Sequence, residues 1–501
     1  MKAKKTGKKA AAATPPRALA WLERPHAGIA LILGLGLLFW LCFAVAGTFS
    51  AAEERITGVD PVAYYAWIRS LAFDRDLDFE NEYRTLVPQE ALSEGSPVDP
   101  DGPRTATGHV QNVFAIGPGL LWAPFLAAGH VAAKLSGVPA DGFSQPYHTA
   151  VFLANVVYGT AGALLLAAAL RAWWDRRTSA LAAVGAWACS PALYYTFGQE
   201  AMSHAPSFFA MALFLCAWLH LRKREAWWGW ALIGAALGLA ALVRWQNVTF
   251  AIIPAIDLLW KPDGKKIARL AICAVATVAV FSPQMAGWHV LYGSPLTIPQ
   301  GEGFMTWLRP ALLRVLFSGE EGLLTWTPLM AAGVFGLFLW SKEEKKAYAA
   351  MLAAVLIQVY VSACAGDAGW SFGMRRLVNC APFFGVGLAT VFTRYLAGKI
   401  RWAAVIVGAC AVWNALFAMQ YGGLLNTLYI NDALHTLAEQ HRVSVDALVN
   451  MDTLPDGTPF NIEEFARAHH FPRDAAPTVR QFIPDKLTVL FVFARRIVGL
   501  G

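Results

Sequence analysis

Apolar and polar segments alternate along most of the chain, and the apolar segments recur at lengths suited to one structural element. A helix of about 20 apolar residues crosses the roughly 30 Å hydrocarbon core of a bilayer and satisfies its own backbone hydrogen bonds there. The pattern predicts an all-α polytopic membrane protein with about eleven transmembrane helices. The eleven windows are residues 28–49, 149–170, 179–197, 203–220, 227–243, 246–260, 267–286, 322–340, 347–364, 381–397 and 402–420.

Basic residues occur at alternate connections between these windows. The N-terminus reads "MKAKKTGKK", and later basic connections read "RAWWDRR", "LRKRE", "KPDGKK", "SKEEKK" and "RYLAGKIR". Because short cytoplasmic loops hold the excess of Lys and Arg, we expect residues 1–27 and these loops to be cytoplasmic. The large loop 50–148 and the tail 421–501 then lie outside. The apolar segment 117–135 is expected to be an interfacial or re-entrant helix on the outer side, since counting it as a span would reverse every later loop.

Composition agrees with a membrane protein. Hydrophobic residues make up 56% of the 501 positions and charged residues 15%, whereas about a quarter of the residues of a soluble domain are charged. The net charge of +7 is explained by the basic cytoplasmic loops, so no nucleic-acid partner is expected.

The seven cysteines show no metal-binding spacing. Most lie in apolar windows and are expected to be small core residues. A disulfide between Cys364 and Cys380, which bracket one outer loop, is the alternative.

An acidic and aromatic stretch, "TGVDPVAYYAWIRSLAFDRDLDFENEY" (57–83), follows the first window directly. Its first part predicts an amphipathic juxtamembrane helix with Asp60 near the N-cap and Pro61 in the first turn. We expect Val62, Tyr65, Trp67 and Ile68 to face the membrane interface, with aromatic rings at headgroup level. On local sequence alone, Asp60 is expected to be a helix cap. The following "DRDLDFENE" indicates a solvated loop or a loose cation site.

Other polar residues interrupt apolar sequence at outer helix junctions. Glu200 and His204 are four residues apart and would share a helix face; they are either structural or part of a site. Arg244, in "LVRWQN", has apolar flanks, where an arginine needs a partner or a function. The remaining candidates are the adjacent Arg375 and Arg376 in "GMRRL" and His109 in "TGHVQNVFAIG".

The layout resembles the GT-C glycosyltransferase superfamily, which includes the protein O-mannosyltransferases and the aminoarabinose transferases that act on lipid A. The matching pieces are "GVDPVAYY" after the first span, "GLLTWTP" (322–328) and "GWSFGMRRL" (369–377). The likeness covers residues 28–420 as one transmembrane catalytic module. It does not extend to 421–501, which is expected to be a small extracytoplasmic region.

The resemblance implies an integral glycosyltransferase of a bacterial inner (plasma) membrane, with its active site facing the periplasm or exterior. A sugar would pass from a polyprenyl-phosphate-linked donor to an acceptor hydroxyl on a lipid, glycan or protein, and membrane lipids would surround the protein. Asp60 would be the catalytic base and Glu200 would orient the acceptor or the base. The implied substrate-binding residues are Tyr64, His109, His204, Arg244, Arg375 and Arg376.

Two alternatives remain open from the residues themselves. No cofactor is expected, but Asp60, Glu200 and His204 could instead hold a divalent metal ion. A polytopic transporter or flippase for a lipid-linked or anionic substrate would also place arginines at outer helix junctions.

Overall fold

The structure is a computed structural model, and its described part is helical. Only isolated bridges, such as Arg104 with Val110, have strand-like pairing among the described residues. The described residues are 19–46, 56, 58–87, 92, 96–199, 201–301, 303–319, 321–339, 344–366, 371–422, 424, 426–462, 465 and 479–498.

Seven helices of the described residues are long and apolar enough to cross a membrane. Each falls on one of the predicted windows, which confirms a multi-pass integral membrane protein. They are α1 (Ala27–Ala46), α5 (Gln145–Leu170), α8 (His204–Leu221), α11 (Gly264–Tyr292), α15 (Lys345–Cys364), the continuous η6 and α16 (Arg375–Cys380 and Ala381–Tyr395) and α17 (Ile400–Tyr421).

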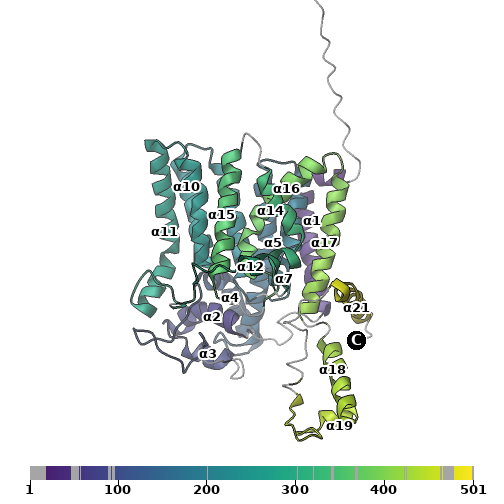
Figure 1. Cartoon of the computed structure of the whole chain (residues 1–501). Helices are drawn as coiled ribbons and strands as arrows, with labels where there is room; N and C mark the ends of the chain where they lie inside the picture. Colours follow the sequence, from purple (N-terminus) through teal and green to yellow (C-terminus); the bar gives the residue numbers. More distant parts are fainter. Residues whose placement is uncertain are drawn as a thin grey trace, which may run out of the picture.

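The other four predicted windows form shorter helices within the same bundle (Figure 1). Two of these windows are divided at a proline, which cannot donate a helical N–H. Pro191 is the N-cap of α7, and Pro328 is the N-cap of α14. The elements are α6 (Arg176–Ala188), α7 (Ala192–Phe197), α9 (Trp227–Val243), η5 (Trp245–Ala251), α10 (Ile252–Leu259), α13 (Leu323–Trp326) and α14 (Leu329–Phe338). Two further short elements are η1 (Ala20–Glu23) and α12 (Leu312–Phe317).

Helices α9 and α11 approach closely because α9 carries small residues one turn apart. A Cβ at Gly234 would lie 2.2 Å from Cys273 O, and one at Gly238 would lie 2.6 Å from Thr277 O. The Thr277 hydroxyl donates to Gly234 O at 3.0 Å. This is the small-residue packing of membrane helices, in which contact between backbones replaces the hydrophobic effect.

The segment after α1 forms a compact cap at one end of the bundle, where Figure 1 shows α2, α3 and α4 together. It contains α2 (Val59–Arg69), a π-helical turn (Ser70–Asp74), α3 (Glu80–Leu86) and α4 (Gly117–Ser136). Helix α4, which covers the ambiguous segment 117–135, is not among the candidate spans, and it packs on α2 and α5.

The prediction that α2 lies exposed in the membrane interface is wrong. Val62, Tyr65 and Trp67 have no exposed surface. The Tyr65 hydroxyl donates to Gly142 O at 2.6 Å, and Trp67 Nε1 donates to Phe114 O at 3.1 Å. The aromatic side chains that suggested headgroup contact instead form the core of the cap, because the polypeptide from α3 to the start of α5 folds over them.

The acidic run after α2 is held by arginines. Buried Arg69 donates to Glu82 Oε1 at 3.0 Å and also to Asp74. Glu80 pairs with Arg84 at 3.0 Å and with Arg104 at 2.8 Å. Arginines therefore tie three carboxylates of the run into the cap, and part of the predicted loop is α3.

The described part of the tail lies at the same end of the bundle as the cap (Figure 1). Its helices are α18 (Asn426–His441), α19 (Val445–Val449) and α21 (Val479–Ile497). A small apolar cluster joins α18 and α19 through Leu434, Ala438 and Leu448.

In the bundle, Cys364 and Cys380 are both free thiols, so the alternative of a disulfide between them is not realised.

Candidate active site

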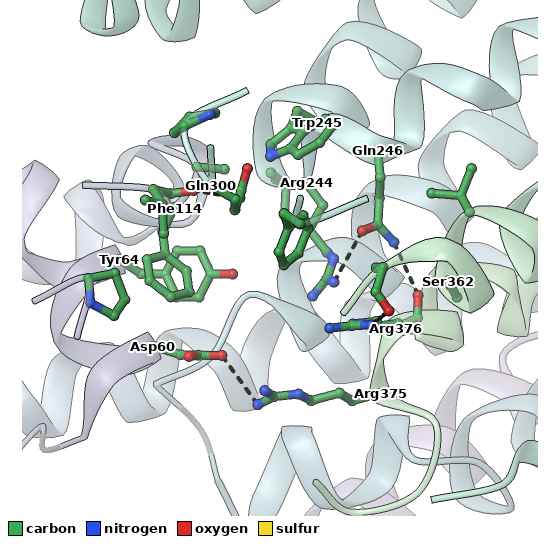
Figure 2. A pocket seen from close by; sticks show the side chains of 18 of the residues that line it. Asp60, Tyr64, Phe114, Arg244, Trp245, Gln246, Gln300, Ser362, Arg375 and Arg376 are labelled. Carbon is green, nitrogen blue, oxygen red and sulfur yellow. Dashed lines mark hydrogen bonds and ion pairs between the residues drawn. The ribbon is translucent and has the colours of Figure 1, made fainter. Parts of the chain in front are cut away.

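A cavity of about 450 Å³ opens where the cap meets the ends of the bundle helices. Figure 2 shows that residues from α2, the α9–η5 junction and η6 face one another across it. Six of the eight residues named from sequence line this cavity: Asp60, Tyr64, His204, Arg244, Arg375 and Arg376.

Asp60 and Arg375 form an ion pair inside the cavity (Figure 2). Arg375 Nη1 lies 3.2 Å from Asp60 Oδ2, and their side chains are 16% and 26% exposed, in the order Arg375 and Asp60. Asp60 stands in the first turn of α2, but the N-cap position is Gly58 and no side chain caps the helix. The interpretation of Asp60 as a helix cap is therefore wrong, and its carboxylate points to an arginine across the cavity.

A left-handed residue brings Arg375 to this position. Gly373 has φ +57°, and a Cβ there would lie 3.1 Å from Pro191 Cγ, so the turn suits glycine on both counts. Arg375 N donates back to Gly373 O at 2.7 Å. The chain can then begin η6 with the Arg375 side chain directed into the cavity.

A short chain of hydrogen bonds connects Arg244 to Tyr64. Arg244 Nη1 donates to Ser203 Oγ at 3.2 Å, and Ser203 Oγ donates to the Tyr64 oxygen at 2.9 Å. Burial raises the pKa of the Tyr64 hydroxyl, although nearby Arg244 lowers it. Tyr64 therefore remains a neutral phenol at neutral pH beside the ion pair.

His204 lies against the same arginine. Arg244 Nη1 is 2.9 Å from His204 Nδ1, and because arginine only donates, this nitrogen must accept. The partner expected for Arg244 is thus present, and the polar contacts with Ser203 and His204 explain how an arginine is accommodated at the end of an apolar helix.

Arg376 lines the cavity from the side of α15. Its Nη1 donates to Ala365 O at 3.3 Å, and its carbonyl accepts from Gln246 Nε2 at 3.2 Å. Behind it, Asn379 donates to Asn247 at 2.7 Å. These buried amides hold η5 and η6 together, and so fix the arginines of both elements.

Two predicted residues are not placed in the cavity. His109 lies in a turn, where its Nδ1 is 3.0 Å from Thr107 Oγ1, and it is not among the described residues lining the cavity. Glu200 lies outside the described residues.

Sequence reasoning missed the uncharged polar residues of the site. Ser203 links Arg244 to Tyr64, Gln246 holds the backbone of η6, and Gln300 donates to Val113 O at 3.1 Å across the wall. Ser203 and Gln246 adjoin His204 and Arg244, so the polar break between apolar windows was the signal available. Gln300 sits in a long connection with no comparable signal.

The described residues contain no group of three His, Cys, Asp or Glu side chains that could hold a metal ion. The partners of Asp60 and His204 among these residues include Arg375 and Arg244, respectively. Asp60 and His204, the two described residues of the predicted metal site, therefore each face an arginine, and this arrangement does not fit a divalent cation.

The fold is similar to those of solved membrane proteins. ArnT from Cupriavidus metallidurans bound to undecaprenyl phosphate matches with a TM-score of 0.50 at 14% sequence identity, over 95% of this chain and 78% of that chain. The apo state of ArnT gives 0.49 at 14% identity, over 94% and 77%. The apo oligosaccharyltransferase of Archaeoglobus fulgidus gives 0.43 at 13% identity, over 90% and 60%. No protein-family model and no curated protein sequence matches the chain.

The match to ArnT bound to undecaprenyl phosphate indicates the class of fold. The chain is an all-α integral membrane protein with a GT-C-like fold, as the likeness to ArnT shows. The GT-C resemblance predicted from the sequence is confirmed at this level.

Proposed function

We propose that this chain is a membrane glycosyltransferase that moves a sugar from a polyprenyl-phosphate-linked donor to an acceptor hydroxyl. The observation that carries the proposal is the Asp60–Arg375 pair, with a separation of 3.2 Å, in a cavity at the end of the membrane bundle. One carboxylate and several arginines are the groups needed to activate a hydroxyl and to bind a departing phosphate.

The donor class is supported by charge and by fold. Arg244, Arg375 and Arg376 line the cavity together, and guanidinium groups bind phosphate through paired N–H donors. ArnT, which has a similar fold, has been solved with undecaprenyl phosphate. A lipid phosphate would keep its chain in the bilayer while its headgroup reaches Arg375.

In the proposed reaction, Asp60 takes the proton of the acceptor hydroxyl as its oxygen attacks the anomeric carbon. The bond between that carbon and the phosphate oxygen breaks, and the phosphate leaves with the electron pair. Arg375 stabilises the charge that develops on the phosphate. Tyr64 lines the same cavity as Asp60 and Arg375. We assign it to substrate binding, together with His204 and Arg244.

Arg375 has two anionic partners in this scheme at different stages. Without donor it neutralises Asp60, as in the observed ion pair. The donor phosphate competes with the Asp60 carboxylate for the guanidinium, and this competition would free the carboxylate to accept the proton of the acceptor hydroxyl. Binding of the donor would thereby activate the base.

The site is proposed to face the exterior of a bacterial inner membrane, with a lipid, glycan or protein as acceptor. Glu200 is proposed to assist Asp60. His109 is proposed to contact the donor, which would require the turn that holds it to move towards the cavity. The distribution of charge along the sequence supports this orientation, because the basic connections and the residues of the cavity fall at opposite ends of the predicted spans.

The proposal is tested with full-length protein in sealed proteoliposomes that contain a radiolabelled prenyl-phosphate sugar. Transfer predicts release of free prenyl phosphate in proportion to protein and acceptor. Movement of intact donor between leaflets with no release of prenyl phosphate would contradict the transferase and support the flippase alternative.

A further inference from the structure

Helix α21, in the C-terminal tail, has two faces of different character. The inward face packs on α1 and α17, and Val489 on this face is fully buried. The opposite face exposes large apolar side chains to 49–62% of their surface: Leu487, Leu490, Phe491 and Ile497; Val498, directly after the helix, is 66% exposed. Their spacing of three, four and seven residues places them on one stripe of the helix.

Specific polar contacts fix which face points outward. Lys486 is buried and donates to Gln420 of α17, and its Nζ lies 4.3 Å from the centre of the Phe417 ring. Ten residues later, Arg496 donates to Ala46 O, the last residue of α1. A cation at this carbonyl also suits the negative end of the α1 dipole. Helix α21 is therefore anchored against the bundle near its middle and at its C-terminal end, and these contacts direct the apolar stripe outward.

The exposed stripe lies beside candidate membrane spans, whose exposed apolar side chains are expected to face lipid. The candidate spans α1 and α17 end beside α21 (Figure 1). Val45 near the end of α1 and Val412 on α17 are exposed apolar residues of these spans. A contiguous apolar patch of this kind marks an interaction surface. Here its neighbours are transmembrane helices, which selects the bilayer over a soluble protein.

We propose that α21 lies in the membrane interface and inserts Leu487, Leu490 and Phe491 among the acyl chains of the leaflet where α1 and α17 end. Exposed Arg495 flanks the stripe, with its guanidinium carbon 6.0 Å from the centre of the Phe491 ring. In the proposed orientation, the Arg495 guanidinium would lie at the level of the anionic phospholipid headgroups. The tail is thus attached to the membrane, independently of the reaction proposed for the cavity.

The first test compares the labelling of single added cysteines by an impermeant maleimide. Phe491→Cys is placed on the stripe, and Val449→Cys, an exposed position of α19 in the same tail, is the matched control. The parent protein corrects for its seven native cysteines. In phospholipid vesicles, we expect Phe491→Cys to react at least about tenfold more slowly than Val449→Cys, because the interface excludes the reagent. Equal rates would overturn the proposal.

A second measurement identifies what covers the stripe. A photoreactive p-benzoylphenylalanine at position 491, in the full chain in vesicles of phosphatidylglycerol and phosphatidylethanolamine, is expected to give phospholipid adducts by mass spectrometry. Adducts with a second copy of the chain would overturn the lipid assignment, as would photolysis that gives no lipid adduct.

Discussion

Arg375 Nη1 lies 3.2 Å from Asp60 Oδ2, which joins η6 of the bundle to α2 of the cap. At this distance the guanidinium neutralises the charge of the carboxylate. In the proposed mechanism the pair is the donor-free arrangement, and the donor phosphate draws Arg375 away. Each group is therefore expected to have a different mutant signature.

Arg375→Ala is expected to weaken binding of a short-chain, soluble prenyl-phosphate analogue by about 1.5–3 kcal/mol, the scale of a hydrogen bond to a charged group. Lys should restore only part of this loss, since it lacks the planar fork. Arg376→Ala is expected to cost less, because its Nη1 is held by Ala365 O. Isothermal calorimetry measures the affinities, with Arg104→Ala outside the cavity as control. Equal affinities for wild type and both cavity variants would rule out a phosphate role.

Gly373→Ala is expected to displace Arg375, because φ +57° disfavours alanine and the new Cβ would meet Pro191 at a cost of about 1–2 kcal/mol. Gly398→Ala is the matched control, since Gly398 has φ +74° but open space around it. Both variants should lose stability in thermal unfolding. Only Gly373→Ala should also lose affinity for the prenyl-phosphate analogue, and an unchanged affinity would show that the turn does not position the arginine.

The charge pattern predicts that the cap and the tail are both outside the cell membrane. Cysteines introduced by Ala106→Cys and Asp456→Cys, at two exposed positions, should react with an impermeant reagent in intact cells. Lys399→Cys, in a basic connection at the other side, should react only after permeabilisation. Labelling of the Asp456 position only in permeabilised cells would overturn this topology.

The sequence predicted the spans well where one window forms one helix. It did not reveal that Pro191 and Pro328 divide two of the apolar windows into shorter elements, because hydropathy averages across a proline. It also misplaced Tyr65 and Trp67, because an aromatic face covered by protein has the same pattern as one covered by lipid headgroups.

The sequence predicted best those residues of the candidate site that carry a charge next to an apolar segment. Arg244, Arg375 and Asp60 stand out because a charged residue beside an apolar helix needs a reason, and all three line one cavity. Ser203 and Gln246 gave a weaker signal, since neutral polar residues are common at helix ends. Their roles depend on bringing α8, η5 and η6 together, which one sequence does not reveal.

Glu82 is expected to make the cap sensitive to pH. Burial raises its pKa to about 7, although Arg69 beside it lowers the pKa, and its Oε2 has no hydrogen-bond partner among the described residues. The folded carboxyl therefore holds a proton that the unfolded chain releases near pH 4.5. The stability this gives is present below pH 4.5 and is lost as pH rises through about 7, on the order of 3 kcal/mol in total.

Hydrogen–deuterium exchange of residues 59–86, corrected for intrinsic rates, measures this dependence between pH 5.5 and 8. Wild type should open more readily at the higher pH, and Glu82→Gln should show a smaller change. Glu80→Gln is the control, because Arg104 and Arg84 lower the pKa of Glu80 at the surface of the cap and its contribution is constant across this range. The same pH change in wild type and Glu82→Gln would contradict the assignment.

The most direct test of the account is single-turnover transfer by purified Asp60→Asn, measured together with its affinity for the donor. Removal of the base should lower the transfer rate at least about 100-fold, while the donor binds as tightly as in wild type or more tightly, since Arg375 no longer has a competing carboxylate. Asp78→Asn, the same change at an exposed position of the cap, should leave both quantities unchanged. A transfer rate for Asp60→Asn close to that of wild type would remove Asp60 from the mechanism and contradict the central claim.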